Sequence, residues 1–331
     1  MITLPGLRGD DPLGFLAAMG LLSLSEQGEL PALRLAWRGG GSPVATVDGS
    51  VHSVQELGQE LQTAFTRLRR DAAMIPGVPP DLPRRTAGTT DPMRMSRIDM
   101  RALYTEADQA WTQRGNAWLA RWLIALTTQT ATKNTQRADV ELTPFYAPTG
   151  RMTMRTSIFE KTMAGVETVG GPRDALTRWR RVPYDGANFD ERAKRDAGVT
   201  TSGEADNLGA PSPTWLAAMG MRFFPMTDDG KDVATVGWQR ARLYPRPYTT
   251  RSLIWPIWEP VLDPAAVRVL LAHPAVRLEG SEEALAPARP RDLAALGVTH
   301  LFGASRRTLT QGDGPLGPAY LIWSASVAQV D

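Results

Sequence analysis

The sequence predicts an α+β fold in which helices are mixed with short antiparallel strands in an irregular, two-lobed architecture. Three observations support this prediction. A five-residue helical motif occurs twice, far apart in the chain. Short apolar segments are joined by turn residues, which is typical of antiparallel hairpins. With 331 residues, 42% of them hydrophobic, the chain is long enough for two modules, which we place at 1–140 and 141–331; one irregular domain is the alternative.

The repeated motif is Leu-Ala-Ala-Met-Gly, at residues 16–20 and again at 216–220. Asp11-Pro12 precedes the first copy and Ser212-Pro213 the second, so each helix begins with a capping side chain and a proline at its first position. The pattern predicts two short buried helices. The paired alanines allow close approach of another element, and the glycine ends the helix or relieves crowding. Coincidence in an alanine-rich chain is the alternative explanation.

The N-terminal module contains a predicted hairpin and an amphipathic helix. Residues 33–37 and 44–47 have the composition of two short strands around a glycine-rich turn at 38–42. Residues 54–70 carry apolar side chains at helical spacing and end in three arginines, which are favourable near the negative end of the helix dipole.

A long helix is expected at about residues 100–126, where Tyr104, Trp111, Trp118 and Trp122 recur at helical spacing. We interpret this aromatic stripe as core, because packing faces are more common than aromatic rows that stack on bases. The polar residues 127–137 show no apolar periodicity and predict a solvent-facing loop.

The C-terminal module begins with turn chemistry at 144–150 and an alternating segment at 151–155, which predicts a strand. Residues 173–210 are rich in charged and small polar side chains, and they predict a basic, partly mobile segment with little to bury. Beyond the second repeat we expect a turn at 228–231, a strand at 233–238, an edge strand at 252–260 because of its two prolines, and a last strand at 319–323.

The composition excludes several classes of site. The chain has no cysteine, so it has no disulfide, thiolate zinc site, iron–sulfur cluster or cysteine nucleophile. We expect no cofactor. No apolar run is long enough to predict a membrane span, and the N-terminus lacks the pattern of a signal peptide. These features predict a cytoplasmic protein without a membrane partner.

Basic residues are concentrated in the middle of the chain. Residues 66–251 have a net charge of +8, whereas 1–65 have −4 and 252–331 have −2. Of the 37 basic residues, 33 are arginines, whose planar guanidinium suits phosphate, carboxylate and base edges. A genome rich in G and C also favours arginine codons, so the placement of the arginines has to decide between the two explanations.

Four segments interleave arginine with aromatic or turn residues: 94–101, 151–155, 178–184 and 240–251. The last contains no acidic residue. Guanidinium groups contact phosphates, and tyrosine rings stack on unpaired bases. Pairing of each arginine with neighbouring acids on an ordinary surface is the alternative. The predicted nucleic-acid-binding residues are Arg94, Arg97, Arg151, Arg155, Arg178, Arg180, Arg181, Arg240, Arg242, Tyr244, Arg246, Tyr248 and Arg251.

Familiar catalytic motifs are absent from the sequence. It has no phosphate-binding loop, no G-x-S-x-G elbow and no H-E-x-x-H motif. Acidic pairs with a basic neighbour occur at Asp228-Asp229 and at Asp190-Glu191. Two carboxylates holding magnesium could activate water against a phosphodiester, so a metal-dependent nuclease is one alternative function. The first pair also has the composition of a hairpin turn, and the second that of a solvated charged surface.

Three segments, residues 4–22, 212–225 and 255–258, together resemble a known group of proteins. They are similar to accessory and large-subunit-like proteins of class 1 CRISPR systems of type I-U, also called I-G, in which a PLGFLAALGLL-like helix and a later WLA-x-x-G-[LM]-R-[FL]-F-P-like segment recur. The resemblance implies a subunit or companion of an RNA-guided DNA surveillance complex. In such complexes base pairing reads the target and protein subunits hold the backbones.

The resemblance implies no catalytic residue here, because the matched motifs look like packing helices and carry no active-site signature. It also implies that a separate helicase–nuclease does the nuclease work. The chain is short for a full large subunit, which leaves a smaller role open. We therefore expect a non-catalytic protein that binds guide RNA, target DNA or both, together with other effector subunits. The alternatives are the nuclease described above, another enzyme of unrecognised family, and a structural subunit whose two repeat helices dock onto a partner.

Overall fold

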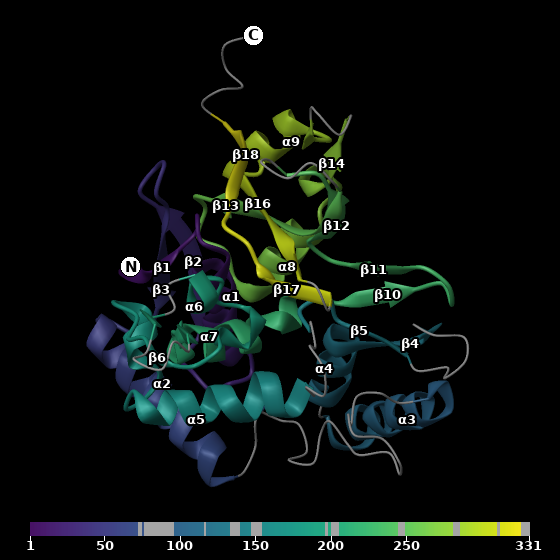
Figure 1. Ribbon diagram of the computed structural model, residues 1–331, viewed down its shortest axis with the longest axis horizontal. Helices are drawn as coiled ribbons and strands as arrows, with labels where there is room; N and C mark the ends of the chain where they lie inside the picture. The colour runs from purple at the N-terminus through teal and green to yellow at the C-terminus, as the bar shows by residue number, and fades with distance from the viewer. Residues whose placement is uncertain are drawn as a thin grey trace.

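The computed structural model describes residues 1–71, 75, 96–115, 117–132, 140–146, 154–195, 198–199, 205–243, 249–280, 285–309 and 312–325. The fold is α+β, as the sequence predicts, with helices around small antiparallel sheets. In Figure 1 the C-terminal strands lie in the upper part of the view and the N-terminal strands at the left. None of the described helices is long and apolar enough to span a membrane.

The N-terminal sheet consists of β1 (Ile2–Arg8), β2 (Leu33–Arg38) and β3 (Val44–Gly49), in the order β1-β3-β2. The predicted hairpin is confirmed by the pairing of β2 with β3. Helices α1 (Pro12–Glu26) and α2 (Val54–Arg70) pack beside this sheet. The predicted helix at 54–70 is confirmed, with Ser53 accepting a hydrogen bond from the Glu56 amide at its start.

Helix α1 crosses α7 (Pro211–Gly220), so the two copies of the repeat pack against each other. A β-carbon at Gly20 would overlap the carbonyl oxygen of Leu216, and one at Gly220 would overlap that of Leu16. Every residue of α7 is buried, as is α1 from Pro12 to Ser25. The predicted buried helices and close approach are confirmed. Because both helices are covered within the chain, they offer no face for a partner.

The predicted capping holds for the first copy only. Asp11 accepts hydrogen bonds from the amides of Leu13, at 2.9 Å, and Gly14, at 3.4 Å. The prediction for Ser212 was wrong, because α7 begins two residues earlier than expected, at Pro211 after Ala210, and has no side-chain cap. Ser212 instead donates a hydrogen bond to the Gly171 carbonyl at 3.0 Å, which ties α7 to the turn between α5 and η2.

The predicted long helix at 100–126 is two helices, α3 (Arg97–Arg114) and α4 (Trp118–Leu126). Gly115, with a φ of 65°, ends α3 in the left-handed conformation. The interpretation of the aromatic stripe as core is confirmed for Trp122, which is fully buried, and was wrong for Trp111, which is 57% exposed. The predicted loop at 127–137 was wrong in its first half, because β4 (Thr127–Thr132) pairs with β5 (Val140–Leu142). Threonine is β-branched and favours strands even where the sequence is polar.

The strand predicted at 151–155 was also wrong at its described end. Residues 151–153 lie outside the described residues, Met154 is helical, and η1 (Arg155–Glu160) is a π-helix that continues into α5 (Lys161–Thr168). Residues 196–197 and 200–204, within the segment expected to be mobile, are likewise outside the described part. The segment contains η2 (Pro172–Leu176), β6 (Val182–Pro183), η3 (Gly186–Asn188), α6 (Arg192–Arg195), β7 (Gly198–Val199), β8 (Ala205–Asp206) and β9 (Leu208–Gly209).

The expectation of a basic segment with little to bury was wrong. Residues 173–210 hold seven basic and seven acidic residues, and the segment contributes to the core. Leu176, Tyr184 and Phe189 are all buried. Phe189 stacks on Phe145 with ring centroids 5.9 Å apart, and the Tyr184 hydroxyl shares a 2.6 Å hydrogen bond with Thr162. A few well-placed aromatic side chains outweigh the polar average composition of the segment.

The largest sheet is C-terminal. Its strands β12 (Trp238–Ala241), β13 (Thr250–Trp258), β16 (Val298–Leu309) and β17 (Gly312–Leu316) follow this order, and β18 (Tyr320–Ser324) also pairs with β16. The predicted last strand is thus confirmed. The remaining elements are η4 (Met221–Phe223), β10 (Met226–Asp228), β11 (Val233–Thr235), α8 (Pro264–Ala272), η5 (Pro274–Val276), β14 (Leu278–Glu279), β15 (Ala286–Pro287) and α9 (Pro290–Ala295).

Two predictions for this region need correction. The strand expected at 233–238 is divided by a turn, since β11 ends at Thr235 and β12 begins at Trp238. The predicted edge strand at 252–260 is β13, which lies between β12 and β16. Its pairing with β12 covers only residues 250–253, so Pro256 lies where a second neighbour is missing. The missing N–H of Pro256 therefore costs no hydrogen bond to β12.

One hydrophobic core connects both predicted modules. Phe15 stacks between Trp37 of β2 and Trp255 of β13, at centroid distances of 5.9 and 5.5 Å. The indole N–H of Trp255 donates to the Gly9 carbonyl at 2.8 Å, and that of Trp258 to the Leu35 carbonyl at 3.0 Å. These contacts join the N-terminal and C-terminal sheets. The division at residue 140 stays a prediction.

Candidate nucleic-acid interface

The structure separates the predicted binding residues into groups. Arg94, Arg151, Tyr244, Arg246 and Tyr248 lie outside the described residues. The other eight are described, and they are not brought together on one surface element: they belong to α3, η1, the loop after η2, and the hairpin of β12 and β13.

Several of the described arginines are used by the fold itself. Arg181 donates to Asp190 at 3.0 and 3.3 Å and to the Leu208 carbonyl at 2.7 Å. Arg155 pairs with Glu160 at 2.7 Å. Arg180 donates to the Val169 carbonyl at 3.4 Å. These three arginines therefore make contacts within the protein, as the alternative explanation expects.

Three further arginines lie apart from the cavity described below. Arg97 is half-buried at the start of α3, and its Nε has no hydrogen-bond partner. Arg178 is exposed beyond η2. Arg242 is half-buried at the end of β12.

Arg240 and Arg251 form the one directly opposed pair of predicted residues in the described part of the chain. They are register partners across the antiparallel strands β12 and β13, and both are exposed. Directly opposed residues in such a pair have β-carbons about 5 Å apart, and two like charges at this spacing destabilise the sheet. The strands therefore place two arginines at directly opposed positions, and neither has an acidic partner among the described residues.

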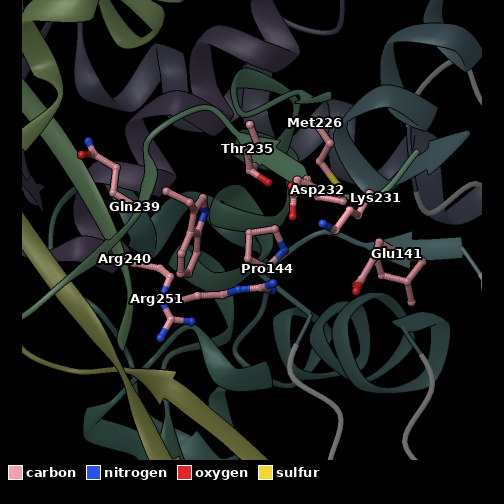
Figure 2. A pocket seen from close by; sticks show the side chains of 13 residues that line it. Glu141, Pro144, Met226, Lys231, Asp232, Thr235, Gln239, Arg240 and Arg251 are labelled. Carbon is pink, nitrogen blue, oxygen red and sulfur yellow. The ribbon is translucent and has the colours of Figure 1, made fainter. Parts of the chain in front are cut away.

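This pair borders a cavity of about 410 Å³ between the β12–β13 hairpin, the β10–β11 hairpin and β5. Three further charged side chains line it: Lys231, Asp232 and Glu141. Figure 2 shows Arg251 and Glu141 reaching the cavity from opposite walls, with Lys231 and Asp232 on the β10–β11 side. Within the described part of the chain, none of these five side chains forms an ion pair or a side-chain hydrogen bond.

The β10–β11 turn is held rigidly by its own carboxylates. Asp229 accepts hydrogen bonds from the amides of Lys231 and Asp232 at 2.9 and 2.8 Å, and these bonds lower its pKa. Asp228 accepts from the Gly230 amide at 2.9 Å and from the Thr130 hydroxyl. Burial alone would raise the pKa of Asp228, but these hydrogen bonds lower it below the ordinary value. The predicted turn at 228–231 is confirmed.

One wall of the cavity is held in place by Arg306, an arginine that the sequence patterns did not single out. Arg306 is buried and donates to the carbonyls of Pro144, at 3.1 Å, and Gly314, at 2.8 Å. Its guanidinium also lies over the Trp238 ring, 5.4 Å from the centroid. Pro144 and Trp238 both line the cavity, so Arg306 fixes the wall on which Arg240 and Arg251 stand.

A second set of arginines converges on Glu26 at the end of α1. Its carboxylate accepts from Arg121 at 3.3 Å and also from Arg222 and Arg268. Trp118 lies between Arg121 and Arg222, with both guanidinium carbons within 4.9 Å of its centroid. Burial lowers the pKa of Arg222 to about 10. Arg222 belongs to the second resemblance segment, and in the structure it is buried against Trp118 and paired with Glu26.

The acidic residues of the second pair are used by contacts within the fold. Asp190 is 2% exposed and accepts from Arg181 and from the amides of Ala210 and Arg192, at 3.0 and 3.1 Å. Asp11, its neighbour across the chain, pairs with Arg192, and burial raises the pKa of Asp11. Among the described residues, no group of three histidine or acidic side chains is arranged to hold a metal ion.

Comparison of the chain with protein-family models and with curated proteins found no match. The likeness to type I-U proteins therefore rests on the three sequence segments alone.

Proposed function

We propose that this protein binds nucleic acid at the cavity bordered by Arg240 and Arg251, as a non-catalytic cytoplasmic subunit or companion of a CRISPR RNA-guided DNA surveillance complex. The observation that carries the proposal is the directly opposed, exposed arginine pair. Guide RNA, target DNA or both would be the ligand, and other effector subunits the protein partners.

The arginine pair has the chemistry that a phosphate requires. Each guanidinium presents several N–H donors in a plane, and a phosphodiester oxygen can accept from two of them at once. An anion placed between Arg240 and Arg251 would also remove the repulsion between them. An arginine that serves only solubility does not need to lie directly opposite a second arginine, because like charges at opposed positions destabilise the sheet.

The contrast with the other arginines supports this assignment. Arg155, Arg180 and Arg181 are occupied by acceptors of the protein, and Arg222 and Arg306 are buried. Arg240 and Arg251 are exposed and have no such acceptor in the described part of the chain. They are therefore available to an external anion.

The place in a CRISPR complex is supported by the resemblance of the sequence segments. In such complexes base pairing reads the target, so a protein subunit needs only to hold backbones and orient strands. A binding cavity without a metal centre in the described residues is compatible with that role.

The test is a binding titration over a salt series with short RNA, single-stranded DNA and duplex DNA. Contacts to phosphate release counterions, so log K should fall linearly with log salt. The double variant Arg240→Gln/Arg251→Gln should bind more weakly, and the salt slope on single strands should shrink by about 1.4, about 0.7 for each lost contact.

The matched control is Arg173→Gln/Arg291→Gln, which removes two exposed arginines that do not line the cavity. This control should bind as the wild type does. Equal effects of the two double variants would mean that the cavity is not the site. The absence of binding to any nucleic acid at low salt would overturn the proposed function.

A further inference from the structure

We infer that Glu141 and Asp232 hold the exocyclic amine of an unpaired base, so that the cavity selects single strands carrying cytosine or adenine over strands of uracil or thymine. This inference rests on the proposed function, because it needs the phosphate of the same nucleotide to lie at Arg240 and Arg251. It adds a base preference, which phosphate contacts alone do not supply.

The cavity is divided by charge. Arg240 and Arg251 stand on the β12–β13 wall, whereas Glu141 stands on β5 and Asp232 in the β10–β11 turn. Figure 2 shows Glu141 and Arg251 extending into the cavity from its opposite sides. This side also holds Lys231, but its two carboxylates repel phosphates, so a nucleic-acid backbone is more favourable along the arginine wall. The rest of the nucleotide then points toward the carboxylates.

A carboxylate that faces a base can only accept hydrogen bonds, so it needs an N–H group opposite. Cytosine and adenine present an exocyclic amine on the Watson–Crick edge, and carboxylates are known to accept from the cytosine amine. Uracil and thymine present two carbonyl oxygens around a single ring N–H, and these oxygens face a carboxylate with like partial charge. The acidic wall therefore favours the amino-bearing bases.

Lys231 adds a hydrogen-bond donor beside the carboxylates of the cavity. It is adjacent to Asp232 in the turn, and both line the cavity. Its ammonium is a donor beside the carboxylate acceptor. In cytosine and adenine a ring nitrogen that accepts lies next to the amine that donates, so the two neighbouring side chains meet complementary groups. The Watson–Crick edge is used by the partner base in a duplex, so this contact requires an unpaired strand.

The experiment compares oligo(dC) with oligo(dU) of equal length, both labelled, and a duplex of the same length. The two single strands carry the same phosphates, so the salt-dependent contribution is alike. We expect the wild type to bind oligo(dC) at least about fivefold more tightly than oligo(dU), the lower range for one specific base contact. The duplex should bind more weakly than oligo(dC).

The variants Glu141→Met and Asp232→Ala should reduce this preference while binding to oligo(dU) is kept or improved, since a repulsive charge is removed. Glu60→Met is the control, because Glu60 is an exposed acid of α2 outside the cavity. It should leave the preference unchanged.

Equal binding of oligo(dC) and oligo(dU) by the wild type, with the arginine-dependent salt slope intact, would overturn the base preference and leave the proposed function standing. Tighter binding of the duplex would overturn the requirement for an unpaired strand. If the wild type bound none of these nucleic acids, both the base preference and the proposed function would be overturned. The comparison in the wild type decides the inference even if a cavity variant does not fold.

Discussion

Gly20 of α1 lies directly against the carbonyl oxygen of Leu216 of α7, and Gly220 has the same relation to Leu16. The two copies of the repeated motif thus cross reciprocally, and each gives its glycine to the backbone of the other. The absence of a β-carbon at both crossing points is what allows the helices to approach so closely.

We expect Gly20→Ala to lower the free energy of unfolding by about 3 kcal/mol, because the added methyl overlaps a backbone oxygen of a buried helix. Urea denaturation measures this change. Gly41→Ala is the matched control, since a β-carbon there meets nothing within 4 Å, and it should change stability by less than about 0.5 kcal/mol. Equal stability of the two variants would contradict the crossing.

Glu26→Gln should be more damaging than an ordinary surface substitution. The change leaves the buried guanidinium of Arg222 without its carboxylate and also removes the partner of Arg268. Loss of one member of a buried ion pair costs about 3 kcal/mol. Glu60→Gln on the exposed face of α2 serves as the control in thermal and urea unfolding. If both variants unfold alike, Glu26 does not join α1 to η4 and α8 energetically.

The same carboxylate predicts sensitivity to acid. Burial alone would raise the pKa of Glu26, but Arg268 and Arg222 lower it below the ordinary value of 4.5. A group with a lowered pKa in the folded state stabilises the fold above its unfolded pKa, and this contribution is lost as the pH falls through the folded pKa. The free energy of unfolding should decline below about pH 4.5 in the wild type and less steeply in Glu26→Gln. Parallel declines would contradict the assignment.

The two tryptophans of the divided aromatic stripe should behave differently. Trp122→Ala empties a fully buried position and should cost about 4 kcal/mol. Trp111→Ala removes a side chain that is 57% exposed and should cost less than about 1 kcal/mol. Measured midpoints in urea compare them directly. A large loss for Trp111 would mean that α3 packs through it, as in one continuous helix.

Substitutions at Asp190 and Asp229 test whether the two acidic pairs have a structural or a catalytic role. Asp190→Asn should cost about 3 kcal/mol, since it breaks a buried pair with Arg181 beside the start of α7. Asp229→Asn should be nearly neutral, because asparagine makes the same turn hydrogen bonds. Neither should affect cleavage of labelled single-stranded DNA with magnesium, which we expect at background. Cleavage by the wild type that Asp229→Asn abolishes would restore the nuclease hypothesis.

The elements that the sequence predicted correctly depend on neighbours close in the chain. The hairpin of β2 and β3, the helix α2, the start of α1 after Asp11 and the turn at 228–231 all follow from local turn, cap and periodicity signals. The same local signals misplaced the start of α7, because Ser212 is used by the Gly171 carbonyl, which lies far away in the sequence.

The amino-acid sequence was also enough to select the 240–251 segment, because this segment contains four arginines and no acid. The folded structure was needed to show that Arg240 opposes Arg251 across the hairpin, that Glu141 and Asp232 line the same cavity, and that Arg181 pairs with Asp190. Composition determines which charges a chain carries. Whether an arginine is paired within the protein depends on the acceptors that folding places within a few ångströms of it. Those acceptors come from strands and turns distant in sequence, so their positions are set by sheet register and packing.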